Sequence, residues 1–495
     1  MTGNIRKFIL VKNQKKTLLY CWDVKKNIKS QIDLKKKNFF LIGYKTSKYS
    51  IDDEFISIEI DKKISIVNDI FGSQPLYHYK NSNKEIFSNS IDEIFKFSKD
   101  ITISKKEIYK YFSFGYLPFS EKTIYNNVRL VQSNSKIEIT KKIQISTIAI
   151  NLFKKKKVNI QKGEKDFLEL FEKKIDTSKL NKSALCLTAG YDSLLSLIYA
   201  KKMTLATFGS SKSLDIIGAK RRKKKFAYNQ KHFIYNIKNH ALKDRDFIEY
   251  AGLLGGFANL SSIQYLFFIN YLKKKKIHYL YFSDHFETAR RNFKNINDLK
   301  NKYLTPSNIV EKYFKKKKIY YLLKKNFVRE INSKYKTNRM NNFYFYDRFI
   351  KGNSWKNQIC SNLGIIRISL PLDFKFINNN FNLLKKNNKN NFFFNLFPNN
   401  KNIKDELNFT EKSYTINSET KDVSAVNSLS ILNLHKKYFI KVINSKYSKQ
   451  FYNYFNLDLM RKSIKETNYI KKEEWFLLRF LSLIIFANKH KIKVK

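Results

Sequence analysis

The segment Leu185–Leu195 contains the residues most suited to binding a phosphate. A short apolar run ends in a glycine-containing turn, Asp192 and Ser193 follow, and a helix-like apolar pattern comes next. In such a turn the backbone N–H groups face an anion, and the dipole of the following helix adds about half a positive charge. Asp192 adds a carboxylate, and the Mg²⁺ that accompanies a nucleotide phosphate prefers oxygen ligands. The segment therefore predicts a site for a polyphosphate and its magnesium ion.

The same residues also suit an ordinary helix start, because Asp and Ser are common N-caps and Gly is common in turns. The turn lacks the Gly-Lys-Ser/Thr ending of the Walker loop, and no Gly-x-Gly-x-x-Gly follows a strand-like run. Two familiar phosphate-binding loops are thus excluded. The surrounding elements must decide between a helix cap and a phosphate site.

A second acidic segment follows the strand-like run Ile277–Phe282 and contains Ser283, Asp284 and Glu287. In a parallel sheet this segment lies at the same edge as Asp192. Carboxylates from two strand ends suit a Mg²⁺ that bridges the phosphates of a nucleotide. The alternative is an acidic loop that caps a helix through Asp284 or Glu287.

The elements that must position these residues change character along the chain. Residues 1 to about 150 are predicted to be β-rich, with apolar runs at Phe8–Val11, Thr17–Trp22, Phe39–Tyr44, Phe55–Ile60 and Ile64–Val67. From about residue 160, strand-like runs alternate with helical stretches, which indicates a parallel sheet with ligands at the carboxyl ends of its strands. The expected strands are Ala184–Leu187, Thr204–Phe208 and Phe233–Tyr235, with helices that begin at Ser193 and near Asp215.

Beyond about residue 240 the pattern is mainly helical. The apolar segment Trp475–Ala487 carries Arg479 and is too short to span a membrane, so it predicts a buried helix. Asn378–Asn402 is biased to Asn, Lys and Phe, and the stretch after it lacks periodicity up to Val426. We expect a long surface excursion there.

The composition excludes several classes of protein. The net charge is +56, but lysine runs occur along the whole chain together with an excess of Asn, Ile, Phe and Tyr, which AT-rich codons favour. A nucleic-acid partner is therefore not expected, since a binding surface would concentrate the charge. Three widely spaced cysteines predict a reducing cytoplasm with no disulfide framework and no zinc site. The start, Met1–Lys7, leads into a strand-like run, so neither a signal peptide nor a membrane partner is expected.

Several segments resemble known motifs. Thr188–Ser193 resembles the Ser-Gly-Gly-x-Asp-Ser pyrophosphate loop of ATP pyrophosphatases. Others resemble the asparagine synthetase family, in family order and over nearly the whole chain. Asp69–Tyr79 resembles the Asp-x-Phe-Gly-x-x-Pro-Leu-Tyr-Tyr motif of that family, and Phe114–Pro118 with Thr123–Tyr125 resembles its Gly-Tyr-x-Pro…Thr-Ile-Tyr motif. Ser283–Glu287 is similar to the Ser-Gly-Asp-Gly-x-Asp motif. Arg367 with Leu370–Asp373 is similar to the Arg-x-Pro-Phe-Leu-Asp motif.

The resemblance implies an α/β protein with two domains. Residues 1–155 would form an amidotransferase-like sandwich of the Ntn-hydrolase type, and residues 156–495 a doubly wound parallel-sheet ATP-pyrophosphatase domain with extra helices. This second domain would use ATP and Mg²⁺ to adenylate a carboxylate, release pyrophosphate and form an amide bond with an amine or ammonia. The implied ATP-binding residues are Leu187, Thr188, Ala189, Gly190, Tyr191, Asp192, Ser193, Phe208, Gly209 and Ser283, and the implied metal ligands are Asp192, Asp284 and Glu287.

The departures from the family narrow the expected function. The chain begins Met1-Thr2-Gly3 where glutaminase members begin Met-Cys-Gly, and neither a His-Arg-Gly nor an Asn-Gly-Glu motif precedes Asp69. We therefore expect that glutamine hydrolysis is lost and that the amine arrives free or on the substrate. Ala189 replaces a glycine and Glu287 replaces an aspartate, and no late lysine stands out as catalytic. A tRNA-modifying ATP pyrophosphatase, a non-catalytic relative and a homodimeric assembly stay open.

Overall fold

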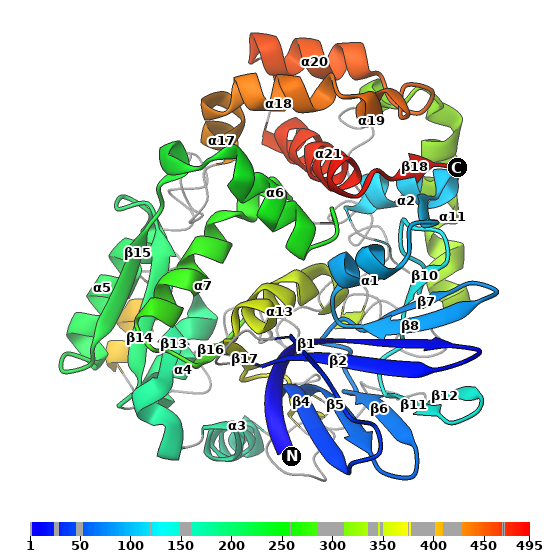
Figure 1. The fold of residues 1–495 in the computed structure, drawn as a ribbon. Helices are drawn as coiled ribbons and strands as arrows, with labels where there is room; N and C mark the ends of the chain where they lie inside the picture. The colour runs from blue at the N-terminus through cyan, green and yellow to red at the C-terminus, as the bar shows by residue number, and fades with distance from the viewer. Residues whose placement is uncertain are drawn as a thin grey trace.

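The computed structural model describes residues 2–23, 29–45, 53–115, 117, 121–148, 160–175, 177–200, 202–257, 259–284, 311–334, 345–346, 350–374, 376–377, 401–408, 428–467, 469 and 471–495. Within these residues the chain is an α/β protein with a large mixed sheet, a parallel sheet and many helices (Figure 1). The predicted boundary between residues 155 and 156 lies outside the described residues.

The large sheet has eleven strands, all from the first 147 residues. Most neighbours are antiparallel, but β1 and β4 run parallel. Alternation of side chains between the two faces buries Ile64 and Ile66 of β6 together with Ile137 and Ile139 of β11. The strands are β1 (Thr2–Asn13), β2 (Thr17–Asp23), β3 (Lys29–Gln31), β4 (Asn38–Tyr44), β5 (Glu54–Ile60), β6 (Ile64–Asn68), β7 (Tyr77–Lys80), β8 (Lys84–Ser88), β10 (Val128–Leu130), β11 (Ser135–Ile139) and β12 (Ile143–Thr147).

The parallel sheet has five strands in the order β15-β14-β13-β16-β17. The central strand of this sheet, β13, is also the first of its five strands along the chain. The strand order therefore runs in opposite directions on its two sides. Ligands of parallel α/β sheets bind in the crevice at such a reversal. The strands are β13 (Ser183–Cys186), β14 (Thr204–Gly209), β15 (His232–Asn236), β16 (Tyr279–Phe282) and β17 (Ile366–Ser369).

The predicted parallel strands are confirmed with small shifts. β13 begins and ends one residue before its predicted bounds, and helix α4 (Tyr191–Tyr199) begins two residues before Ser193. Helix α5 (Leu214–Phe226) begins near Asp215 as expected. β14 ends at Gly209, one residue after its predicted end at Phe208.

Several of the remaining helices pack on one another rather than on a sheet, and one of them joins the two sheets. The helix α13 (Lys351–Leu363) contacts β1 of the large sheet and β17 of the parallel sheet, and β17 itself contacts β4 (Figure 1). The two sheets are therefore packed together around α13. The longer helices are α1 (Ile91–Phe97), α2 (Lys105–Phe114), α3 (Ile160–Lys174), α6 (Asp244–Leu253), α7 (Gln264–Lys274), α11 (Lys317–Lys334), α13 (Lys351–Leu363), α17 (Ser428–Leu434), α18 (Lys436–Ile443), α20 (Leu457–Glu466) and α21 (Lys471–His490).

The predicted buried helix Trp475–Ala487 lies inside α21, and all but a few of its side chains are buried. None of the helices in the described part of the chain combines the length and the apolar run that crossing a bilayer requires. Of the predicted surface excursion from Asn378 to Val426, only residues 401–408 are described.

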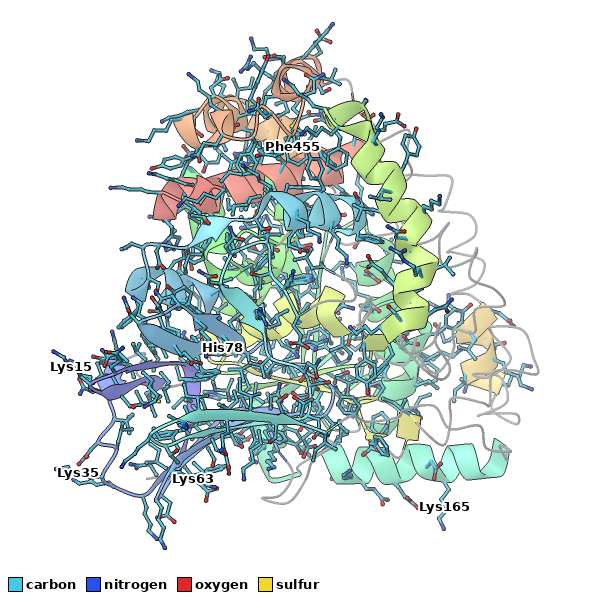
Figure 2. The ribbon with its side chains drawn as sticks, turned by 90° about the vertical axis from the view of Figure 1, so that its right-hand side faces the viewer. Lys15, Lys35, Lys63, His78, Lys165 and Phe455 are labelled. Carbon is cyan, nitrogen blue, oxygen red and sulfur yellow. The ribbon has the colours of Figure 1, made fainter. Side chains whose placement is uncertain are left out.

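Basic side chains leave the surface at many places. Figure 2 shows Lys15, Lys35, Lys63 and Lys165 pointing away from the body of the molecule. Lys15 lies between β1 and β2, Lys35 and Lys63 lie in other turns of the large sheet, and Lys165 lies on α3. These four lysines therefore belong to three separate turns and one helix.

Candidate functional site

A cavity of about 400 Å³ lies at the carboxyl ends of β13, β14 and β16, beside the start of α4 and against α13. We call it the strand-end cavity. Its volume is within the range of small-molecule sites. The structure brings seven of the predicted site residues together around it, namely Thr188, Gly190, Asp192, Ser193, Phe208, Ser283 and Asp284. The motifs after two separate strands therefore meet at one place.

Four other predicted residues support the cavity from behind. Leu187 is fully buried, and its main chain hydrogen-bonds to Ala206 and Thr207 of β14. Ala189 is a buried residue of the turn, and Tyr191 packs against the core beneath α4. Gly209 lies against Ser213 and Ile216 of α5. Glu287, the third predicted metal ligand, lies outside the described residues.

The turn between β13 and α4 is held by hydrogen bonds of its own. The hydroxyl of Ser193 donates to the carbonyl oxygens of Thr188 and Gly190, each at 3.0 Å, and accepts from the Thr188 N–H at 3.2 Å. The Gly190 N–H donates to the hydroxyl of Thr188 at 3.1 Å. Gly190 has extended backbone angles and is the N-cap of α4. The start of α4 therefore faces the cavity in a fixed orientation.

Arg222 of α5 fixes the turn from the side away from solvent, and the sequence analysis missed it. Its guanidinium is fully buried and donates to the carbonyl oxygens of Thr188, Ala189 and Gly190 at 2.7, 2.7 and 2.6 Å. A planar guanidinium has several donors in a rigid arrangement, which suits three converging carbonyl groups. Arg222 lies within a run of basic residues, so only its burial distinguishes it.

Asp215 and Gly218 of α5 complete the support. The Ala189 N–H donates to Oδ1 of Asp215 at 3.2 Å. Burial raises the pKa of Asp215 to about 6, against the lowering by the Ala189 N–H and by Arg222. A Cβ atom on Gly218 would lie 2.5 Å from Cβ of Ala189, so this glycine makes the room that the alanine methyl needs. Helix α5 thus leaves room for the methyl group of Ala189.

These contacts correct one expectation about the turn. The N–H groups of Thr188, Ala189 and Gly190 all donate within the protein, to Ser193, Asp215 and Thr188. They do not face an anion, because side-chain oxygens of the chain itself take their place. A phosphate in the cavity would instead be bound at the start of α4, where the helix dipole is positive, and by nearby side chains.

The acidic side of the cavity carries compensating positive charge. Oδ2 of Asp284 accepts from Arg367 at 2.6 Å and from Lys356 at 3.1 Å. The Arg367 guanidinium is buried and stacks over the ring of Phe282 at 4.5 Å. Burial alone would lower the pKa of Arg367, but Asp284, Tyr265 and Glu54 together raise it above its usual range. Arg367 is therefore charged, and Lys356 adds a second cation at the cavity wall.

The cavity also has an aromatic wall. Tyr265 lies edge-on to Trp355 with ring centroids 5.4 Å apart, and it also packs against Phe208 at 5.8 Å and Phe282 at 6.3 Å. Phe208 in turn stacks on Phe268 of α7 at 4.7 Å. Such rings offer flat faces to a planar heterocycle. The cavity thus has a polar side suited to phosphate and an aromatic side suited to a base.

The metal ligands are the least complete part of the site. Asp192 and Asp284 both line the cavity, but among the described residues no group of three His, Cys, Asp or Glu side chains gathers where it could hold a metal. Two carboxylates suit a Mg²⁺ that keeps waters and takes its other ligands from phosphates. The donor set therefore fits a magnesium ion that arrives with a nucleotide better than one bound by the protein alone.

No model of a known protein family matches the chain, and a search of the curated proteins finds no significant match. The likeness to ATP pyrophosphatases and asparagine synthetases accordingly depends on the motif residues named above and on the cavity where several of them meet.

Proposed function

We propose that this protein is an ATP-dependent carbon–nitrogen ligase that activates a carboxylate as an acyl-adenylate and forms an amide bond. The observation that carries the proposal is the convergence of Thr188–Ser193, Asp284 and an aromatic wall at one cavity, at the reversal of the strand order. A nucleoside triphosphate has the same division between an anionic end and a flat apolar end.

In this proposal ATP lies with its phosphates at the start of α4 and its base against the aromatic rings. The hydroxyls of Thr188 and Ser193 and the ammonium of Lys356 line the polar side of the cavity. Asp192 and Asp284 would hold Mg²⁺, which supplies charge neutralisation of the phosphates when bound. Lys356 is the candidate for the lysine that the sequence left unassigned.

The chemistry requires little proton transfer from the protein. A carboxylate oxygen of the substrate attacks the α-phosphorus of ATP, the bond to the bridging oxygen breaks, and pyrophosphate leaves. The amine nitrogen then attacks the acyl carbon and forms the C–N bond, the bond from this carbon to the AMP oxygen breaks, AMP leaves with that oxygen, and the proton lost by the nitrogen passes to water. The residues of the cavity would bind and orient the two reactants, and Lys356 would stabilise the charge that develops at phosphorus.

The first 155 residues are proposed to form a degenerate amidotransferase-like domain of the Ntn-hydrolase type. The amine would then be free ammonia or a group on the substrate, and the protein would act in the cytoplasm. Residues 1–68 contain neither a His-Arg-Gly nor an Asn-Gly-Glu motif, which supports this reading. The two reactants are a carboxylate and an amine.

The test is pyrophosphate release from ATP in the presence of a panel of carboxylates, followed by mass spectrometry of the adenylated acids. We expect at least one acid to stimulate release, and Asp192→Asn to lower the rate by at least about 100-fold. Asp244→Asn is the matched control, since Asp244 is an exposed acid in the first turn of α6. Equal rates for Asp192→Asn and the native chain would contradict the proposal.

A second candidate is a non-catalytic relative that binds no nucleotide. The observation that favours it is the engagement of three turn N–H groups by side chains of the protein. Titration calorimetry with ATP and Mg²⁺ separates the two candidates. Binding supports the ligase, and no measurable heat at millimolar ATP supports the non-catalytic relative.

A further inference from the structure

The large sheet contributes a buried carboxylate to the environment of the strand-end cavity. Glu54 is the first residue of β5 and only 1 % of it is exposed. One of its carboxylate oxygens, Oε1, accepts from the backbone N–H of Ser369 at the end of β17. The other, Oε2, accepts from Asn357 of α13 at 3.3 Å. Glu54 is thus fixed against the parallel sheet, although it belongs to the large sheet.

Arg367 lies between Glu54 and Asp284. Its guanidinium is 2.6 Å from Oδ2 of Asp284 and 3.8 Å from Oε2 of Glu54, and it also donates to Oδ1 of Asn357 at 2.5 Å. Only 1 % of the Arg367 side chain is exposed, whereas 22 % of the Asp284 side chain is exposed. One buried cation is therefore shared by two carboxylates, of which one faces the cavity and the other is enclosed behind it.

We propose that Glu54 is a positioning residue that allows Asp284 to turn from Arg367 to the magnesium ion of a bound nucleotide. A buried guanidinium that loses its only carboxylate is strongly unfavourable. Glu54 keeps Arg367 compensated, so Asp284 can give up part of its ion pair when a metal approaches. This inference rests on the proposed function, and it makes the large sheet a part of the nucleotide site.

A purely structural role for Glu54 predicts something different. If Glu54 only joined the two sheets, its loss would weaken nucleotide binding equally with and without magnesium. The proposed role acts through Asp284 and therefore changes the part of the affinity that magnesium adds. The dependence of ATP binding on magnesium is the readout that separates the two roles.

The experiment uses the full chain and titration calorimetry with ATP, once with excess Mg²⁺ and once with EDTA. Glu54→Gln removes the charge of Glu54, and Glu59→Gln is the matched control because Glu59 is exposed on the same strand. The gain is the ratio of the ATP affinity with Mg²⁺ to the ATP affinity in EDTA. We expect Glu54→Gln to lower this gain about tenfold, while its ATP affinity in EDTA is unchanged. Glu59→Gln should retain the whole gain.

A Glu54→Gln variant that keeps the full gain, or that loses affinity equally in EDTA, would overturn the inference. Glu54→Asp retains the charge and is expected to keep most of the gain. It provides the test if Glu54→Gln does not fold. Loss of the gain in Glu54→Asp would also count against the inference. A native chain that binds no ATP in either buffer refutes the proposed function itself, which distinguishes that failure from a failure of the role of Glu54.

Discussion

Two sides of the strand-end cavity are held in place in different ways. The turn Thr188–Gly190 is fixed through its main chain by Arg222, which is only 32 to 34 residues away along the chain. Asp284, which follows β16, is fixed through its side chain by Arg367, 83 residues away, and Arg367 lies beside Glu54 of the other sheet. The first support is local and made of hydrogen bonds to neutral groups, whereas the second is distant and ionic. Substitutions on the turn side should therefore change mainly stability, and those on the acidic side mainly ligand affinity.

The largest expected effect is on the turn side. Arg222→Met removes the buried guanidinium that donates to three carbonyl oxygens of the turn and should lower the free energy of unfolding by about 3–5 kcal/mol. Urea denaturation measures the loss. Lys224→Met is the control, because Lys224 is exposed on the same helix, and its unfolding should be unchanged within about 0.5 kcal/mol. Similar losses in both variants would show that Arg222 does not support the turn.

The next effect is a pH dependence of the same support. Because the pKa of Asp215 is raised by burial to about 6 from an ordinary 3.8, the stability that it contributes is complete below about pH 4 and is lost as the pH rises through about 6. This pKa shift corresponds to a change of at most about 3 kcal/mol in the free energy of unfolding. Asp215→Asn keeps an acceptor for the Ala189 N–H but cannot ionise, so its stability should fall less between these pH values than that of the native chain. Parallel curves of urea midpoint against pH for the two proteins would contradict the assignment.

A smaller effect tests the fit between the turn and α5. Gly218→Ala places a methyl group 2.5 Å from Cβ of Ala189 and should cost about 1–3 kcal/mol of unfolding free energy. In an Ala189→Gly background the contact between the two Cβ atoms is absent, so the same substitution should cost less, although the new methyl group still lies 2.9 Å from Cα of residue 189. The double-mutant cycle measures the difference. Equal costs in both backgrounds would show that the two residues do not interact.

The smallest expected effect is on the acidic side. Lys356→Met removes a cation from the cavity wall and should weaken ATP binding by about tenfold, or about 1.4 kcal/mol, with little change in stability. Calorimetry and thermal unfolding together measure the two quantities. Lys238→Met, at an exposed site after β15, is the control. A large loss of stability without a loss of affinity would break the distinction between the two sides of the cavity.

The turn and its flanking strands could be predicted because their pattern is local. An apolar run, a turn and an apolar helix specify β13 and α4 within a window of about a dozen residues. Arg222 could not be predicted, because it is one of several basic residues on α5 and only tertiary packing buries it. The turn N–H groups were expected to face a ligand, but Asp215 and two hydroxyls occupy them, which the residue types alone do not reveal.

The acidic side was predictable only in part. The position of Asp284 after a strand placed it correctly at the edge of the parallel sheet, and the resemblance pointed to Arg367 without giving it a role. The proximity of Glu54 to Arg367 depends on the packing of two sheets whose contacting residues are 315 positions apart in the chain. No periodicity or motif in a single sequence encodes such a pairing.

The aromatic wall has a practical consequence. The chain contains three tryptophans, and Trp355 is the one at the strand-end cavity; Trp22 is buried in the large sheet and Trp475 is partly exposed on α21. Indole emission responds to stacking and to polarity. A protein with phenylalanine at positions 22 and 475 would therefore carry a built-in optical probe of occupancy, and stopped-flow quenching could time the arrival of a ligand without any added dye.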